Sequence, residues 1–242
     1  VVRRRPGDIL RAAFAREAES ALLPLLELAH TRGVRVEART PAELAALAQT
    51  SNHEGVCIQV RARRWMPPAA LADALVADRA CALALDRVRN PYNVGAIVRT
   101  AAFFGLGGVV LGAPAPHPAL AADAARVAEG GAEDVPLVRT TDLARTLAQL
   151  RERGVLTVGL ESDGADDLLR VSRELSRPVV LVVGHEREGL SPRVRAECQR
   201  TARIVGVSAQ FSLNVAVATS IAIAIVAGAP PVGRVDGGRA RR

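Results

Sequence analysis

The sequence predicts an α/β fold with a mainly parallel sheet, preceded by a small α/β unit. From Cys81 onward, short apolar runs typical of strands alternate with segments of helical pattern, which favours a parallel sheet with helical crossovers. The run Val179–Val183 is apolar throughout, as in a strand buried on both faces. The stretch Ile204–Val226 begins apolar, passes through a polar loop and continues as a helix of mostly Ala, Val and Ile. Such a strand, loop and helix start can form a small-ligand site from backbone amides, although a plain core strand–turn–helix has the same pattern.

The first 62 residues are expected to form the small unit. Because the chain begins at Val1 rather than methionine, we expect a processed or truncated N-terminus. Its predicted elements are a strand over Asp8–Phe14, a helix over Glu19–Thr31 stopped by Gly33, a strand over Val34–Ala38, a helix over Pro41–Gln49 capped by Thr40, and a strand over Val56–Val60.

Residues 63–80 are predicted to form a linker and a short helix, residues 81–228 the main domain, and residues 229–242 a disordered tail rich in Pro, Gly and Arg. The predicted elements of the main domain are a strand over Cys81–Leu85, a helix over Val94–Phe104 capped by Asn93, a strand over Gly108–Leu111, a helix over Ala119–Ala128, a strand near Val135–Val138, a helix over Asp142–Arg153 capped by Thr141, strands over Val155–Leu160 and Val179–Val183, a strand beginning at Ile204, and a helix to Val226 capped by Ser212. The last helix is apolar on every side, so we expect it to be buried, and it is too short and polar at its start to span a bilayer.

Charge and composition favour a polyanionic partner. The 242-residue chain has a net charge of +7 and a pI of about 10.9, and its basic side chains are all arginine. The absence of lysine excludes Schiff-base and P-loop chemistry. Aromatic residues are few, so phosphate contact by arginine fits better than stacking on bases.

Cysteine usage indicates a reducing, cytoplasmic compartment. Cys57, Cys81 and Cys198 are far apart and form no CxxC pair, so the sequence predicts neither a metal site nor a disulfide framework. No signal peptide or membrane span is recognised.

Three loops have the composition of functional sites, and ligands of parallel sheets bind beyond the carboxyl ends of strands. The first, Asp86–Gly95, leads into a helix that contains Arg99, which by spacing alone is equally well a surface arginine. The second, Gly184–Ser191, has glycines near both ends but lacks the lysine of a phosphate loop, and the chain has no GxGxxG fingerprint. In this loop Glu186 could meet a cation or a ribose hydroxyl, whereas a lone histidine such as His185 is more often a bystander. The third loop is the one after Ile204.

Taken together, the three loops resemble the three motifs of the SpoU (TrmH-type) RNA 2′-O-ribose methyltransferases of the SPOUT superfamily. Asn93–Thr100 matches the first motif, N-x-G-x-x-x-R-[TS]; Val183–Ser191 matches the second and Ser212–Ala218 the third. The segment Ala128–Glu133 is also similar to the family. The resemblance covers about residues 81–228, and the first 60 residues resemble the ribosomal-protein-type RNA-binding domain that many members have in front.

The resemblance implies a deep trefoil knot, a homodimer with the active site completed across the interface, and S-adenosylmethionine as methyl donor, without a metal. In the family the arginine of the first motif, here Arg99, is assigned to activating the ribose hydroxyl. Because guanidinium keeps its proton, we expect Arg99 to hold a phosphate and orient the hydroxyl, with another group or water accepting the proton. The implied catalytic residues are Arg99, Asn93, Glu186, Ser212 and Asn214. The implied cofactor-binding residues are Gly184, Ile204, Gly206 and Leu213. The arginines expected to contact ribosomal or transfer RNA are Arg61, Arg63, Arg64, Arg87 and Arg89.

One departure from the family leaves alternatives open. Where the third motif is usually preceded by Ile-Pro-Met, this chain has Ile204-Val205-Gly206, which puts cofactor affinity in question. The alternatives are a non-catalytic RNA-binding or ribosome-assembly protein with the same fold, a base methyltransferase of a related knotted group, and an unrelated nucleotide-binding enzyme.

Overall fold

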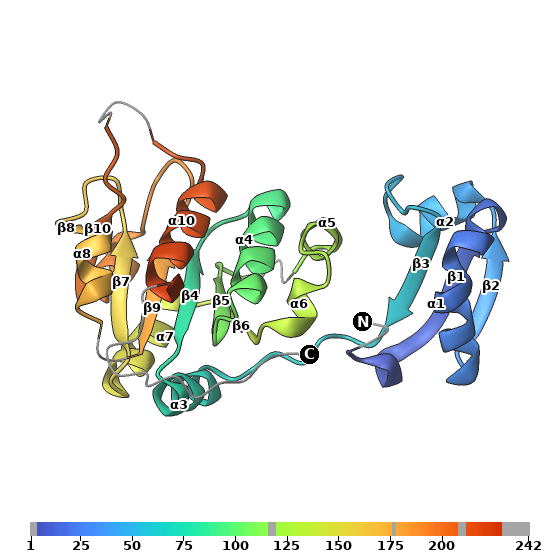
Figure 1. Cartoon of the computed structure of the whole chain (residues 1–242), viewed down its shortest axis with the longest axis horizontal. Helices are drawn as coiled ribbons and strands as arrows, with labels where there is room; N and C mark the ends of the chain where they lie inside the picture. Colours follow the sequence, from blue (N-terminus) through green and yellow to red (C-terminus); the bar gives the residue numbers. More distant parts are fainter. Residues whose placement is uncertain (1–3, 116–119, 176–177, 208–211, 229–242) are drawn as a thin grey trace. The chain divides into compact units, whose positions relative to one another are not determined.

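The computed structural model describes residues 4–115, 120–175, 178–207 and 212–228, which divide between Arg64 and Trp65 into two compact units (Figure 1). The predicted tail, the predicted start of a helix at Ala119 and part of the third loop lie outside the described residues. Each unit has its own sheet.

The first unit is a three-stranded sheet of order β2-β1-β3 with one helix on each face. In it, β1 pairs parallel with β2 and antiparallel with β3. Its elements are η1 (Pro6–Asp8), β1 (Ile9–Ala15), η2 (Arg16–Ala18), α1 (Glu19–Thr31), β2 (Arg35–Arg39), α2 (Pro41–Ala48) and β3 (Val56–Val60). The predicted helices and strands of this unit are confirmed to within one or two residues. Thr40 caps α2 as predicted, because its side chain accepts from the amide of Glu43 while the Glu43 carboxylate accepts from the amide of Thr40.

The second unit is built on a seven-stranded sheet of order β6-β5-β4-β9-β7-β10-β8, in which every pairing is parallel. Its strands are β4 (Cys81–Asp86), β5 (Gly108–Gly112), β6 (Leu137–Thr140), β7 (Leu156–Leu160), β8 (Asp166–Asp167), β9 (Val179–Val183) and β10 (Arg200–Arg203). Its helices are α3 (Pro68–Asp78), α4 (Pro91–Phe103), α5 (Ala122–Val127), α6 (Gly131–Asp134), α7 (Leu143–Glu152), α8 (Leu168–Arg173), α9 (Pro192–Ala196) and α10 (Val215–Gly228). The predicted parallel sheet is confirmed, and the knot stays a prediction.

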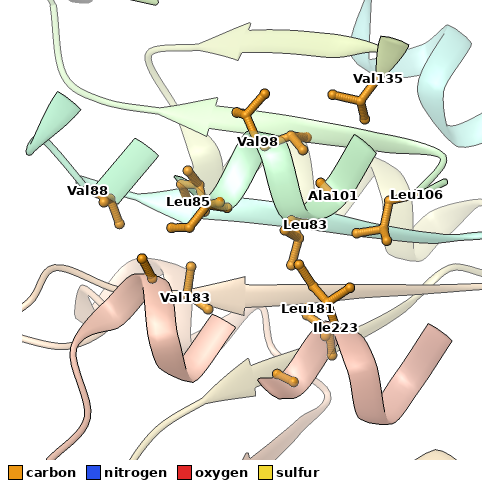
Figure 2. Packing of buried hydrophobic residues seen from close by; sticks show 14 of the residues in the cluster. Leu83, Leu85, Val88, Val98, Ala101, Leu106, Val135, Leu181, Val183 and Ile223 are labelled. Carbon is orange, nitrogen blue, oxygen red and sulfur yellow. The ribbon is translucent and has the colours of Figure 1, made fainter. Parts of the chain in front are cut away.

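Helices cover both faces of this sheet. Side chains that alternate along β4 enter two separate cores: Leu83 and Leu85 pack with α4 and α10, whereas Ala82 and Ala84 pack with α3 and α7. Figure 2 shows the first core, where Leu181 of β9 meets Ile223 of α10 and Val98 of α4 lies over the neighbouring strands. Burial on both faces explains why β4 and β9 are apolar without alternation.

Three predictions about helix starts are wrong. Asn90, not Asn93, caps α4, since its side-chain oxygen accepts from the amides of Tyr92 and Asn93. Asp142, not Thr141, caps α7. Asn214, not Ser212, accepts from the amides of Ala216 and Val217 at the start of α10. In each case two polar residues compete for the cap within three positions of the sequence, and residue type alone does not decide between them.

The edge of the sheet was also predicted incompletely. The strand expected from Ile204 ends before that residue, as β10, and α6, α8 and β8 have no counterpart among the predicted elements. The strand β10 is polar and is held by side-chain partners: Arg200 pairs with Asp166 and Glu174, and Ala202 is its fully buried residue. Helix α10 is not buried on every side, because Val217 and Ile221 remain exposed.

Candidate active site

The three loops follow β4, β9 and β10, and the first two of these strands are neighbours. Since the sheet is parallel, all three loops leave from its carboxyl edge, where ligands of such sheets bind. The last residue of β4, Asp86, is buried, and its Oδ2 accepts from the amide of Ser191 at 2.6 Å. This bond ties the end of the second loop to the start of the first. A charged residue that ends an otherwise apolar strand is a signal that could have identified Asp86 from the sequence.

Asn93 connects all three loops. As the third residue of α4, it donates from Nδ2 to Oε1 of Glu186 at 2.9 Å, in the second loop. Its Oδ1 accepts from Nδ2 of Asn214 at 3.3 Å, before α10. The structure thus brings three predicted catalytic residues into one hydrogen-bonded chain, although they are up to 121 positions apart. Ser212 lies two residues before Asn214 and is exposed. Among the described residues, it makes no hydrogen bond to the side chains of Asn93, Glu186 or Asn214.

The second loop is closed on itself. His185 and Gly189 exchange two backbone hydrogen bonds of 3.0 and 2.9 Å, and Gly189 has the left-handed φ of +68° that such a turn requires. Gly184 lies so close to this turn that a Cβ atom on it would be 2.2 Å from the carbonyl carbon of Gly189. In contrast, a Cβ atom on Gly189 or on Gly206 would meet nothing within 4 Å. Bare backbone of this kind fits a cofactor that is held through peptide groups.

Arg87, in the first loop, binds two residues of the second loop. Its backbone is left-handed with φ of +60°, its guanidinium forms an ion pair with Glu188, and its Nη2 donates to the carbonyl of Gly189 at 3.2 Å. The hydrogen bond from Arg87 lowers the pKa of Glu188 below its usual range. The side chain of Arg87 is therefore engaged in the fold, and its predicted contact with RNA stays a prediction.

We expect Arg87→Met to weaken binding of S-adenosylmethionine, the cofactor that the motif resemblance implies, about three- to tenfold, since the loop loses a charge-assisted hydrogen bond that holds its backbone. Titration calorimetry measures this change. The matched control is Arg89→Met, two residues on, whose side chain is exposed. Equal affinities for wild type and Arg87→Met would contradict the assignment.

Arg99 lies apart from the Asn93 chain. It is six residues further along α4 and donates from Nη1 to Oε1 of Glu129 at 2.7 Å, in the turn between α5 and α6. Next to it, Thr100 shares a 3.1 Å hydrogen bond with Ser220 and so joins α4 to α10. Glu129 belongs to the segment Ala128–Glu133, which is similar to the family in sequence but for which no function is predicted.

The remaining predicted binding residues are half-buried or exposed. Ile204 is half-buried, whereas Gly206 and Leu213 are exposed on either side of residues outside the described part of the chain. Val205, at the departure from the family pattern, is exposed too. Arg61, Arg64 and Arg89 are exposed, and Arg63 is half-buried.

Burial raises the pKa of Cys81 and of Cys198 to about 12, so neither thiol is a nucleophile near neutral pH. Among residues 4–115, 120–175, 178–207 and 212–228 no group of three or more His, Cys, Asp or Glu could hold a metal ion.

Within the same ranges, no helix has the length and apolar character needed to cross a bilayer.

The fold is an α/β fold with three motif loops at the carboxyl edge of a parallel sheet, and the comparisons with known proteins identify its family. A family model described as the SpoU rRNA methylase family matches residues 80–224, and one described as RNA 2′-O ribose methyltransferase substrate binding matches residues 3–66. The chain belongs to the SpoU rRNA methylase family. It is an RNA 2′-O-ribose methyltransferase.

Individual relatives extend the similarity over most of the chain. The 23S rRNA (guanosine-2′-O-)-methyltransferase RlmB of Vibrio cholerae is 32% identical over 225 residues, which are 92% of this chain and 90% of the relative. An uncharacterized tRNA/rRNA methyltransferase of Mycolicibacterium gilvum is 34% identical over 92% of this chain and 70% of the relative. The crystal structure of an AdoMet-bound rRNA methyltransferase from Sinorhizobium meliloti has a TM-score of 0.74 at 26% identity, covering 90% of this chain and 79% of that one. AviRb of Streptomyces viridochromogenes, in complex with AdoMet, shares the fold with a TM-score of 0.74 at 23% identity, over 91% of this chain and 82% of its own.

Proposed function

We propose that this enzyme methylates a ribose 2′-hydroxyl of structured ribosomal RNA in the cytoplasm. The observation that supports the site is the hydrogen-bonded chain Glu186–Asn93–Asn214, which joins the three motif loops at the carboxyl edge of the sheet. The relatives named RlmB are 23S rRNA guanosine methyltransferases, so a guanosine of the large-subunit RNA is the first candidate.

Mass-spectrometric mapping of 2′-O-methylated nucleotides, in RNA from cells with and without this gene, tests the proposal. One ribosomal position should lose its methyl group when the gene is removed and regain it with purified protein, S-adenosylmethionine and unmodified RNA. Loss of a methyl group from transfer RNA instead would show that transfer RNA is the substrate. Loss of a methyl group from a base would refute the assignment to ribose.

Backbone groups of the second and third loops are proposed to hold the cofactor. Gly184, Ile204, Gly206 and Leu213 line it, and when bound it supplies an electrophilic methyl group. Asn93, Glu186 and Asn214 keep the loops in register, and Asn214 also orders the start of α10 by accepting from the amides of Ala216 and Val217. Arg99 holds the phosphate next to the target and orients the 2′-oxygen, because guanidinium offers several donors but keeps its proton.

The first unit is proposed to dock the RNA. Residues 1–62 act as the substrate-binding domain, residues 63–80 as the connection and residues 81–228 as the transfer domain. Arginines 61, 63 and 64 contact phosphates, with Arg89 and Arg87 near the site, and such contacts position an RNA without selecting its sequence.

We therefore expect RNA affinity to fall steeply with salt. Arg64→Ala should weaken binding and lower the slope of log K against log salt by about one, because one phosphate contact is lost. Filter binding or fluorescence anisotropy over a salt series measures the slope. Arg170→Ala, an exposed arginine outside the proposed RNA-binding set, is the control and should leave the slope unchanged. An affinity that does not depend on salt would exclude phosphate contact.

A homodimer is proposed because α4 and α10, which pack on each other, each leave apolar side chains exposed. Val217 and Ile221 of α10 and Tyr92 and Phe103 of α4 remain exposed in one chain, and exposed apolar patches mark interaction sites.

We expect wild-type protein to be a dimer in light scattering and Val217→Glu to be a monomer, since a buried unpaired charge disfavours the interface. Val76→Glu is the matched control. Val76 is 43% exposed and Val217 is 48% exposed, but Val76 lies on α3, which packs on the opposite face of the sheet. A monomeric wild type at micromolar concentration would contradict the proposal.

A further inference from the structure

The ion pair between Arg99 and Glu129 joins two elements that are 30 positions apart. In the described part of the chain, only Nη1 of the Arg99 guanidinium has a hydrogen bond or ion pair, whereas Nη2 and Nε have none. The side chains of Arg99 and Glu129 are 56% and 62% exposed. One edge of the guanidinium is thus held by a carboxylate while the other edge stays open to a ligand.

Glu129 occupies a backbone conformation that favours glycine. Its φ is +46°, and the next residue, Gly130, has a φ of +87°. Glycine at position 129 would adopt this turn without strain, whereas a residue with a Cβ atom adopts it at a cost. Strained non-glycine residues concentrate at functional sites, because a side chain is needed there that the turn itself does not require.

Two glycines bring the backbones of this pair close together. A Cβ atom on Gly95 of α4 would lie 2.6 Å from the carbonyl oxygen of Ala124, and one on Gly131 would lie 3.2 Å from the Cα atom of Arg99. The helix α4 therefore packs closely on α5 and α6, with the side chains of Val127 and Ala102 also at these contacts. This close packing fixes where the carboxylate of Glu129 meets the guanidinium of Arg99.

We propose that Glu129 is a positioning residue for methyl transfer: it holds the Nη1 side of Arg99, so that the open edge of the guanidinium faces the RNA. The inference rests on the proposed role of Arg99 in orienting the target ribose and phosphate. A freely rotating arginine samples many directions, and a fixed one presents its donors in a single direction. Glu129 itself does not touch the RNA.

The test compares Glu129→Gln and Glu129→Gly with wild type. We expect kcat on RNA about fivefold lower in both, the upper end of what an exposed ion pair contributes, with KM for RNA changed less than about twofold. Glu129→Gly should also unfold at the same temperature as wild type or a higher one, because glycine relieves the left-handed backbone. The control is Asp123→Asn, an acidic residue of α5 that pairs within its own helix with Arg126, and it should leave kcat unchanged.

Opposite results separate the explanations. If Glu129 is merely structural, Glu129→Gly loses stability together with turnover, and the proposal is overturned. If Glu129 instead blocks Arg99, both variants bind RNA more tightly and turn over faster, which also overturns it.

The Arg99→Ala background gives a readout that does not depend on turnover. There, Glu129→Gln should cause no further change in RNA affinity, measured without cofactor, and an added change would show that Glu129 acts on RNA directly. An active Arg99→Ala enzyme would refute the proposed role of Arg99. An inactive Arg99→Ala together with a fully active Glu129→Gln would refute the present inference alone.

Discussion

Arg99→Ala is expected to lower methyl transfer at least about a hundredfold, because the ribose and its phosphate lose the group that orients them. S-adenosylmethionine binding should stay within about twofold of wild type, since among the described residues the side chain of Arg99 pairs only with Glu129, and that pair is exposed. Transfer is measured with labelled methyl donor under single-turnover conditions, and cofactor affinity by calorimetry.

The control is Arg126→Ala, an exposed arginine of the neighbouring α5 whose carboxylate partner is 3.9 Å away. It removes the same side chain from the same region without touching the proposed site, and full activity is expected. Retained turnover in Arg99→Ala would refute the assignment, and loss of cofactor binding would show that α4 itself had been disturbed.

Gly184→Ala is expected to abolish detectable S-adenosylmethionine binding, which corresponds to an affinity loss of at least about a hundredfold when the loop backbone shifts and its hydrogen bonds are broken. The added methyl carbon would lie 2.2 and 2.3 Å from the carbonyl carbon and oxygen of Gly189, far inside van der Waals contact. Backbone cannot rotate away as a flexible side chain can, so the turn His185–Gly189 has to open or move.

Gly7→Ala is the matched control. It adds the same methyl group at a glycine that has open space around it and no positive φ, and it should change neither cofactor affinity nor stability. Calorimetry measures cofactor binding, and circular dichroism verifies that both variants are folded. Normal cofactor affinity in Gly184→Ala would mean that the second loop does not form the binding site.

Local pattern was sufficient where a single interaction decides the structure. The helix Glu19–Thr31 and the strands Val56–Val60 and Val179–Val183 have the predicted bounds, because apolar spacing and a glycine stop act within a few residues. Pattern failed where neighbours compete or where the partner is remote. Asn90 and Asn93 are both good caps, and the structure uses the first as the cap and the second as a connector. The strand Arg200–Arg203 has no apolar periodicity and depends on Asp166 and Glu174.

The sequence by itself determined the α/β class, the two-part organisation of the chain and the three loops that resemble the SpoU motifs, since these depend on residue type and short-range order. Only the tertiary structure decided that Asn93 joins Glu186 to Asn214, that Arg87 clamps the second loop, and that Glu129 holds Arg99. The physical reason is strand order. β9 pairs with β4, although β4 lies about a hundred residues earlier in the chain. This pairing brings the loops that follow the two strands together. Hydrophobic periodicity specifies which residues are buried, but it does not specify which strand lies next to which.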